Sequence, residues 1–424
     1  MSARFTGLWH HPDFLKLWVG QTLSGFGGEF GALAFPLVAI VTLHATPAQV
    51  GFLAGMRSLP WLLFGLFVGV GIDRLPRRPI LIAADLGRAL LLGSVPIAAL
   101  FGVLGIVQLY IVVFLVGTMS VCFETTYQSY LPSLVVRERL VEGNGKLAIT
   151  ESMTGIVGPS LAGIVVQFLT APIGVAADAL SFLGSALSLG LIRKREPPPA
   201  QSAPQSTWSA LREGFSFMRR QSLVRAFTGC NATFMFFFTV TQAVLLLFFT
   251  RHLHLKPVII GLIFAVGDVG GLLGATIAGR LGKTLAPGPT IMGSAFLRAF
   301  GLSCVSLAVL VPSVAVPVLL VSQILQAFGW AIWGVNQGST RQLLVPDRLR
   351  GRVNGSFLFL VRGVTSLGGF AGGVLAGGVG VVPTLVIGAT GSLLCTGWLL
   401  ASPLWSLREQ PMPTEDRSVT DSPQ

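Results

Sequence analysis

The residues of this sequence that could do chemistry are charged side chains standing inside long apolar runs. Glu29 is the clearest case, because it lies near the middle of residues 20–43, GQTLSGFGGEFGALAFPLVAIVTL. An ionisable side chain inside a membrane span is costly, and it is by default a candidate for proton transfer, ion pairing or substrate contact. The other such residues are Arg57, Asp85, Arg88, Glu124, Glu151, Asp178, Asp268, Arg298 and Arg362.

Enzyme and metal chemistry are not indicated. No two of the five histidines stand four residues apart, and the sequence has neither an HExxH motif nor a P-loop. The cysteines all fall in apolar runs without a CxxC spacing, which favours inert buried thiols over a disulfide framework or a metal site. We therefore expect no catalytic group, no metal and no cofactor.

The elements that must position these charges are membrane-spanning helices. The 424 residues are 52% hydrophobic and only 11% charged, whereas a soluble protein carries about 25% charged residues. A helix needs about 20 apolar residues to cross the hydrocarbon core. The sequence predicts an all-α membrane protein with twelve transmembrane helices, at roughly 14–43, 49–72, 79–103, 106–131, 146–170, 172–192, 224–250, 258–281, 288–311, 314–340, 353–378 and 381–404.

The net charge of +12 is explained by topology. Loops after the even-numbered spans are basic, as in DRLPRRP and RQLLVPDRLRGR, whereas the other loops carry few or no charges, apart from RHLHLK at 251–256. By the positive-inside rule, the basic loops and both termini are cytoplasmic. Nucleic acid is therefore not an expected partner, although such a charge on a soluble protein would suggest it.

An internal repeat relates the two halves of the chain. An offset of 210 residues pairs NGKLAITESMTGIVGPSLAG, from Asn144, with NGSFLFLVRGVTSLGGFAGG, from Asn354, and it pairs Arg88 with Arg298. Both copies enter the membrane from the cytoplasm, so the halves are expected to be related by a pseudo-two-fold axis along the membrane normal. Substrate then binds near the midplane between the halves.

The repeat and the composition predict four segments. Residues 1–192 and 223–405 form two six-helix halves, and 406–424 form a disordered tail. Between the halves, 193–222 form a cytoplasmic linker. Its second part, WSALREGFSFMRR, reads as an amphipathic surface helix, with apolar residues on one face: Trp208, Leu211, Phe215 and Met218.

The loop GVGIDRLPRR resembles the signature between the second and third helices of the major facilitator superfamily. The matching residues are Gly69, Asp73, Arg74, Arg77 and Arg78, with departures at Gly71 and Pro76. More narrowly, GQTLSGFG, DRLPRRPILIAADLGRALLLG, YQSYLPSLV and DALSFLGSAL resemble the bacterial exporter branch that includes enterobactin-type siderophore exporters and macrolide-efflux proteins. The resemblance implies the fold and an export direction.

Two motifs acquire roles from this resemblance. Asp73 would accept hydrogen bonds from a helix N-terminus of the other half, near Val353, and so hold the cytoplasmic face shut in one state; the alternative is that its loop only sets topology. GIVGPSLAG is similar to the superfamily's antiporter signature in the fifth helix, which goes with export. Its matching or small residues are Gly155, Gly158, Pro159 and Gly163, while Thr154 and Ala162 stand where glycine is usual.

The intramembrane charges give candidates for proton coupling or gating: Glu29, Arg57, Asp85, Arg88 and Glu124. Glu29 lies about 20 Å, and Arg57 about 12 Å, from the outer end of its span, so the two could pair. The exporter branch tends to carry glutamine at both positions. Glu29 is then a structural or gating ion, a proton carrier or a substrate contact, with Glu124 as the rival carrier. Asp85 and Arg88 share a helix face.

These observations predict a secondary active efflux transporter in the bacterial inner membrane. We expect a monomer that exports an amphipathic organic compound, such as a drug, a macrolide or a siderophore, by proton antiport and alternating access. A lipid translocase or scramblase and an uncoupled facilitator are the alternatives. Candidates for lining the cavity, several of which would more simply face lipid, are Tyr127, Phe234, Phe237, Asp268, Trp330 and Trp333.

Overall fold

The computed structural model describes residues 7–72, 75–194, 196 and 207–407, and every regular element in this part of the chain is helical. Eleven of the helices are long and apolar enough to cross a membrane. A further helix, α2 (Pro47–Ile72), covers the second predicted span. The predicted all-α membrane fold is therefore confirmed, and helix bounds differ from the predicted spans by a few residues.

The chain forms two compact units. Unit 1 comprises residues 1–203 together with 255–265, and unit 2 comprises 204–254 together with 266–424. The predicted segment boundaries differ from these limits chiefly because residues 255–265, the start of one helix, pack with the first unit. The four predicted segments remain a prediction.

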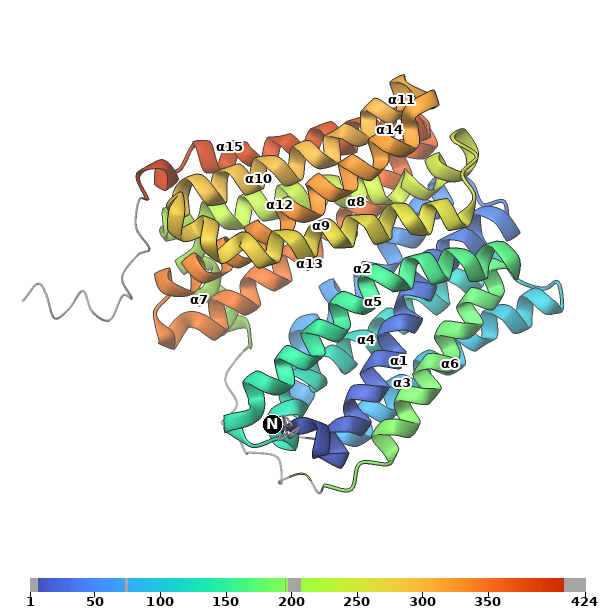
Figure 1. The fold of residues 1–424 in the computed structure, drawn as a ribbon, viewed down its shortest axis with the longest axis horizontal. Helices are drawn as coiled ribbons and strands as arrows, with labels where there is room; N and C mark the ends of the chain where they lie inside the picture. Colours follow the sequence, from blue (N-terminus) through green and yellow to red (C-terminus); the bar gives the residue numbers. More distant parts are fainter. Residues whose placement is uncertain (1–6, 73–74, 195, 197–206, 408–424) are drawn as a thin grey trace, which may run out of the picture. The chain divides into compact units, whose positions relative to one another are not determined.

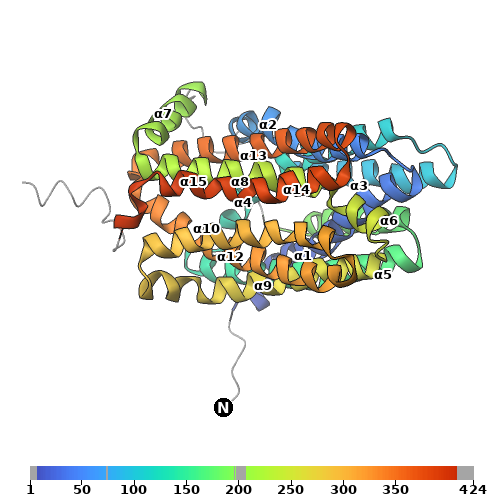
Figure 2. The same cartoon turned by 90° about the horizontal axis from the view of Figure 1, so that it is seen from above.

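Unit 1 is built around α1, which runs beside α5 and α6 (Figures 1 and 2). Its helices are α1 (Pro12–Leu37) with the π-turn η2 (Val38–Thr42), α2, α3 (Arg77–Leu100), α4 (Ile106–Leu134), α5 (Leu140–Phe168) and α6 (Ala171–Gly190), with short 3-10 turns η1 (Leu8–His10) and η3 (Arg137–Arg139). Glycines let α1 approach α6 closely. A Cβ at Gly20 would lie 3.2 Å from the Ser188 side chain, and one at Gly27 would overlap Ser181.

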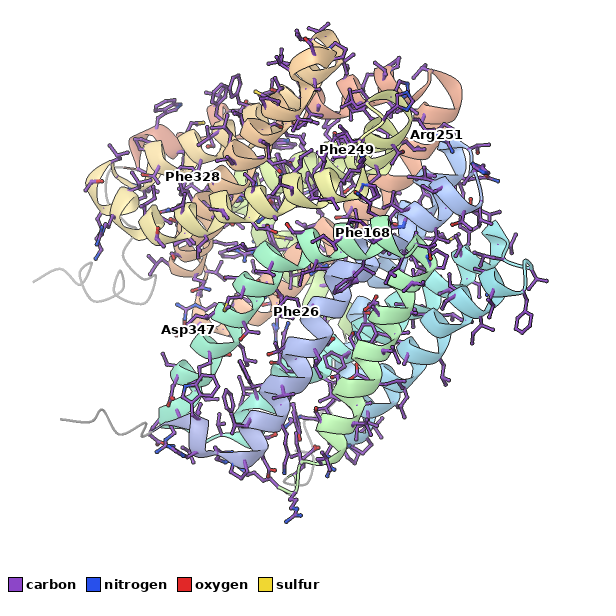
Figure 3. All side chains as sticks on the ribbon, turned by 45° about the vertical axis from the view of Figure 1, so that its right-hand side comes forward. Phe26, Phe168, Phe249, Arg251, Phe328 and Asp347 are labelled. Carbon is purple, nitrogen blue, oxygen red and sulfur yellow. The ribbon has the colours of Figure 1, made fainter. Side chains whose placement is uncertain are left out.

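Unit 2 repeats this plan with α8 beside α13 and α10 beside α12 (Figure 2). Its elements are α7 (Thr207–Arg220), α8 (Ser222–Leu247) with η4 (Phe248–His252), α9 (Pro257–Thr284) from residue 266 onward, α10 (Pro287–Ser303), η5 (Cys304–Ser306), α11 (Leu307–Leu310), η6 (Pro312–Val314), α12 (Ala315–Leu344), α13 (Asp347–Gly378), α14 (Val381–Gly391), η7 (Ser392–Leu394), α15 (Cys395–Leu400) and η8 (Pro403–Ser406). Arg251, in η4, and Asp347, which begins α13, lie at opposite ends of this unit (Figure 3).

The packing of glycines supports the internal repeat. In unit 1, a Cβ at Gly158 of α5 would lie 2.7 Å from Cβ of Glu29 on α1. In unit 2, a Cβ at Gly368 of α13 would lie 3.1 Å from Cβ of Thr239 on α8. Both pairs are related by the same offset of 210 residues, so equivalent glycines hold equivalent helices together.

A second repeated feature was missed in the sequence. Helices α1 and α8 both end in a π-turn, and each turn is followed by a histidine with φ of +49°, His44 and His254. This left-handed conformation is uncommon for a residue with a side chain. The stretches LHATP, at 43–47, and LHLKP, at 253–257, lie 210 residues apart. The shared LHxxP pattern is the signal that could have identified this corner.

The linker helix α7 buries its apolar face, in keeping with its amphipathic pattern. Leu211 and Met218 are buried within unit 2, and a Cβ at Gly214 would lie 2.6 Å from the Arg352 carbonyl oxygen of α13. The Trp208 side chain lies outside the described residues. An amphipathic pattern shows that a face must be covered but not what covers it, and here the cover is α13.

Glu213 fastens α7 to the start of α13. Its carboxylate accepts a hydrogen bond from Arg348 at 3.1 Å and forms an ion pair with Arg352, while the Ser356 hydroxyl donates to the Leu211 carbonyl at 3.3 Å. Since all three groups of the Glu213 cluster are partly exposed, each pair contributes at most about 1 kcal/mol.

Replacing Glu213 by glutamine is expected to loosen α7 without unfolding the unit. Hydrogen–deuterium exchange should rise across 207–220, because both charge pairs are weakened, and should stay unchanged in α10. Glu138→Gln removes an exposed carboxylate of η3 and serves as the control. Equal exchange in α7 of the Glu213 variant and the wild type would contradict this role.

Candidate functional site

Arg88 is the centre of a buried cluster in unit 1. Its guanidinium forms an ion pair with Asp85, one turn earlier on α3, as their spacing predicted. The guanidinium carbon lies 4.3 Å from the ring centre of Phe123 on α4 and 4.1 Å from that of Phe182 on α6. Arg88 is 6% exposed and Asp85 0%. A charge so far from water is held by its counter-ion and by cation–π contact with two rings.

Asp178 of α6 adjoins this cluster and was not among the leading sequence candidates. Its carboxylate lies against α1, where a Cβ at Gly31 would overlap Oδ2 and one at Gly27 would lie 3.0 Å from Oδ1. Asp178 interacts electrostatically with Arg88 and Arg57. The available signal was the pair of glycines four residues apart in GGEFG, which marks a helix face with room for a neighbour.

Glu29 lies on α1 against α5, with Cγ 2.6 Å from the position that a Cβ on Gly158 would take. Arg57 is exposed on α2. The contact of Glu29 with α5 neither requires nor excludes an ion pair with Arg57. That pair therefore remains a prediction. The structure instead relates Arg57 electrostatically to Asp178.

Glu124 and Tyr127 lie on α4, beside Phe123. The Tyr127 ring stacks on Phe123 at 5.9 Å with an interplanar angle of 11°. Glu124 is exposed, and it interacts electrostatically with Arg88. The structure thus brings three of the predicted coupling candidates, Asp85, Arg88 and Glu124, into one neighbourhood.

Arg298 of α10 occupies the corresponding position in unit 2 and is 0% exposed. It donates to Asn231 Oδ1 at 3.2 Å and to Cys230 Sγ at 3.5 Å. Its guanidinium carbon lies 4.3 Å from the ring of Phe234 and 4.1 Å from that of Trp333. Since Trp333 stands 210 residues after Phe123, both arginines pack on an aromatic ring at an equivalent position.

The other cavity candidates of unit 2 are two aromatic residues, Trp330 and Phe237, and one acid, Asp268. Trp330 is 38% exposed, and its ring lies 5.6 Å from Phe234 and 6.2 Å from Phe238. Phe237 packs elsewhere, where a Cβ at Gly391 would overlap its ring. Asp268 is exposed on α9, so it does not join this aromatic group through any contact found in the described residues.

The predicted switch loop is only partly described. Asp73 and Arg74 lie outside the described residues, and Gly69 lies within α2. The backbone N–H groups of Arg77 and Arg78 donate to the Glu196 carboxylate at 2.8 and 2.6 Å. Arg78 Nε also donates to the Leu189 carbonyl at 2.8 Å. The basic end of the loop is thereby fixed to α6 and to the residues that follow it.

The glycine motif of α5 makes close contacts on two sides. Gly155 lies in the helix, and Gly158 contacts Glu29. In the part of α9 that belongs to unit 1, a Cβ at Gly261 would overlap the Pro159 carbonyl oxygen, and Gly163 leaves room for the Pro257 carbonyl, 2.5 Å from its own Cβ position. Close packing is therefore an observed property of this motif, while its link to transport remains a prediction.

Replacing each of the two buried arginines should lower the free energy of unfolding by a different amount. Arg88→Met leaves Asp85 buried without a counter-ion, which costs about 3–5 kcal/mol. Arg298→Met leaves only neutral groups without their hydrogen-bond partner, which costs about 1–3 kcal/mol. Unfolding with a denaturing detergent measures both, and Asp85→Leu added to Arg88→Met should recover most of the loss. Equal destabilisation by the two single variants would contradict this account.

Solved transporters share this fold. The chain is similar to a bacterial homologue of the iron transporter ferroportin in its inward-facing state, with a TM-score of 0.74 and 18% identity, covering 92% of this chain and 98% of that one. It is also similar to the nucleoside transporter NupG, with a TM-score of 0.74 and 15% identity over 92% and 99% of the two chains. At these identities the likeness concerns the fold alone.

Sequence relatives extend over most of the chain. It is 27% identical to the enterobactin exporter EntS of Citrobacter koseri, over 96% of this chain and 95% of that one, and 25% identical to YfiS of Bacillus subtilis, an uncharacterized MFS-type transporter, over 88% of each. A family model described as transmembrane secretion effector matches residues 5–419. The chain therefore belongs to the transmembrane secretion effector family of major facilitator superfamily transporters.

Proposed function

We propose that this membrane transporter is a proton-coupled antiporter that exports an amphipathic organic compound by alternating access. The observation that carries the proposal is the concentration of acids and arginines in unit 1. Five carboxylates stand on five of its membrane helices, namely Glu29, Asp85, Glu124, Glu151 and Asp178. Intramembrane carboxylates are typical of proton relays in transporters.

The charges of unit 1 favour protons as the driving ion. Among the charged residues inside the apolar runs of unit 1, five carboxylates outnumber the two cations, Arg57 and Arg88; the carboxylates are Glu29, Asp85, Glu124, Glu151 and Asp178. Asp85 is already paired with Arg88, so the remaining acids must share few positive charges. A buried carboxylate without a full counter-charge gains from binding a proton. The sequence also lacks an ATP-binding motif, which makes ion coupling the economical energy source.

The direction of transport is inferred from two features. Relatives at 27% identity over nearly the whole chain are enterobactin exporters. The Gly158–Pro159 pair of α5 matches the antiporter-like signature, and Gly158 contacts Glu29 directly. Export from the cytoplasm through the bacterial inner membrane, with both termini cytoplasmic and the protein acting as a monomer, is the arrangement that these features favour.

Aromatic side chains of unit 2 suit an amphipathic substrate. Phe234, Phe238 and Trp330 form one group of rings, and the exposed part of Trp330 offers a flat apolar face. Such faces accept aromatic or cationic groups with little geometric demand. A siderophore, a macrolide or a cationic drug has the required mixture of apolar and polar surface, and the relationship to enterobactin exporters favours the siderophore.

Proton coupling is expected to appear as gradient-driven transport. A thermal-shift panel of a catecholate siderophore, a macrolide and a cationic dye selects the compound that most stabilises the purified protein. In liposomes with an acidic lumen, this compound should accumulate, and nigericin should abolish accumulation. Accumulation that survives collapse of the gradient would contradict coupling, and flipping of labelled lipid without any gradient would favour a scramblase instead.

Variants of Glu29 and Arg57 distinguish a structural ion pair from a carboxylate that itself takes part in proton coupling. If their charges only neutralise each other, Glu29→Gln should impair coupled transport and the added Arg57→Gln should restore it, because no charge is left uncompensated. Initial rates of gradient-driven uptake measure this, with Glu138→Gln as the control. Continued loss in the double variant would mean that Glu29 itself acts in coupling.

A further inference from the structure

The Asp178 carboxylate lies in a cradle made by the backbone of α1. Asp178 is 5% exposed, and the two α1 residues that face it are Gly27 and Gly31. A side-chain atom at Gly31 would overlap Oδ2, and one at Gly27 would lie 3.0 Å from Oδ1. The absence of side chains at Gly27 and Gly31 therefore lets the Asp178 carboxyl group approach the backbone of α1.

The hydrogen bonding of this carboxylate is incomplete. Oδ1 is buried and has no hydrogen-bond partner among the described residues. Burying a charged oxygen without a donor is costly, whereas a protonated carboxyl group carries no charge and supplies a donor of its own. The cradle thus suits the protonated form at least as well as the charged one.

The neighbouring charges also leave Asp178 undercompensated. From α3 it faces the Asp85–Arg88 pair, and Glu124 of α4 acts on the same arginine. Arg88 lies between Phe123 and Phe182 and is already ion-paired with Asp85, so its one positive charge is shared between two acids. From α1, Gly27 and Gly31 face Asp178, whereas Glu29 lies against Gly158 of α5. The remaining cation is Arg57, which is exposed on α2.

From this arrangement we infer that Asp178 is the carboxylate that binds and releases the coupling proton. The step adds one proton to one carboxylate oxygen and changes no other bond. A positive charge near Asp178 favours release, and its withdrawal favours binding. The inference rests on the proposed proton antiport, and it replaces Glu29 and Glu124 as the leading carriers.

Infrared difference spectroscopy tests the proton site without any substrate. Purified protein in lipid nanodiscs is moved between alkaline and acidic pH, and a carboxylic C=O band that shifts in D₂O is expected from the wild type. Asp178→Asn should remove this band, whereas Glu29→Gln, Glu124→Gln and the exposed control Asp347→Asn should retain it. Persistence of the band in Asp178→Asn would overturn the inference.

A second variant keeps the test decisive if Asp178→Asn fails to fold. Arg57→Gln leaves the carboxyl group in place but removes a cation that acts electrostatically on Asp178, so the pH midpoint of the same band is expected to shift. Arg251→Gln, which removes an exposed arginine of unit 2, should leave the midpoint unchanged. An unchanged midpoint in Arg57→Gln would overturn the assignment of the band to Asp178.

Transport measurements separate this inference from the proposed function. In liposomes that contain a pH-sensitive dye, the wild type should exchange protons for the compound selected by thermal shift. Asp178→Asn should retain downhill exchange of that compound but lose the proton movement and the gradient-driven accumulation. If the wild type moves no protons, the antiport proposal fails; if Asp178→Asn still moves them, antiport stands and the inference about Asp178 fails.

Discussion

A guanidinium charge buried away from water must be solvated by the protein itself, and both units are organised around that requirement. Arg88 meets it with a carboxylate and two rings, and Arg298 meets it with two rings, an amide oxygen and a thiol. These groups come from different helices, so each arginine fixes the spacing of three helices at once. A misplaced helix would expose an uncompensated charge to the hydrocarbon, which costs several kcal/mol.

Both units have a buried arginine at the repeated position, but only unit 1 has acidic residues at the positions of Asp85 and Glu29. The position of Asp85 is Ala295 in unit 2, and that of Glu29 is Thr239. Because Arg298 is stabilised without a carboxylate among the described residues, unit 2 has no surplus negative charge at the corresponding place. Unit 1 therefore carries the carboxylates to which a cation can bind, whereas unit 2 presents aromatic side chains.

The sequence predicted the parts of this molecule that depend on local pattern. Apolar length identified the spans, and i, i+3 spacing placed Asp85 beside Arg88, because both follow from the geometry of one helix. Contacts between helices could not be predicted from the sequence. Nothing in the spacing indicates that Phe182 packs on Arg88, that Asp178 meets Gly27, or that α13 is the helix on which α7 packs.

The stretch GGEFG shows how one turn of α1 serves two carboxylates. Successive residues turn by about 100° around a helix, so Gly27 and Gly31 lie close together on one face and Glu29 lies on the opposite face. Asp178 of α6 packs on the glycine face, and Gly158 of α5 packs on Glu29. A helix diameter of about 10 Å then separates the two acids. Their mutual repulsion is thereby limited, and the charge on one can change without dictating the charge on the other.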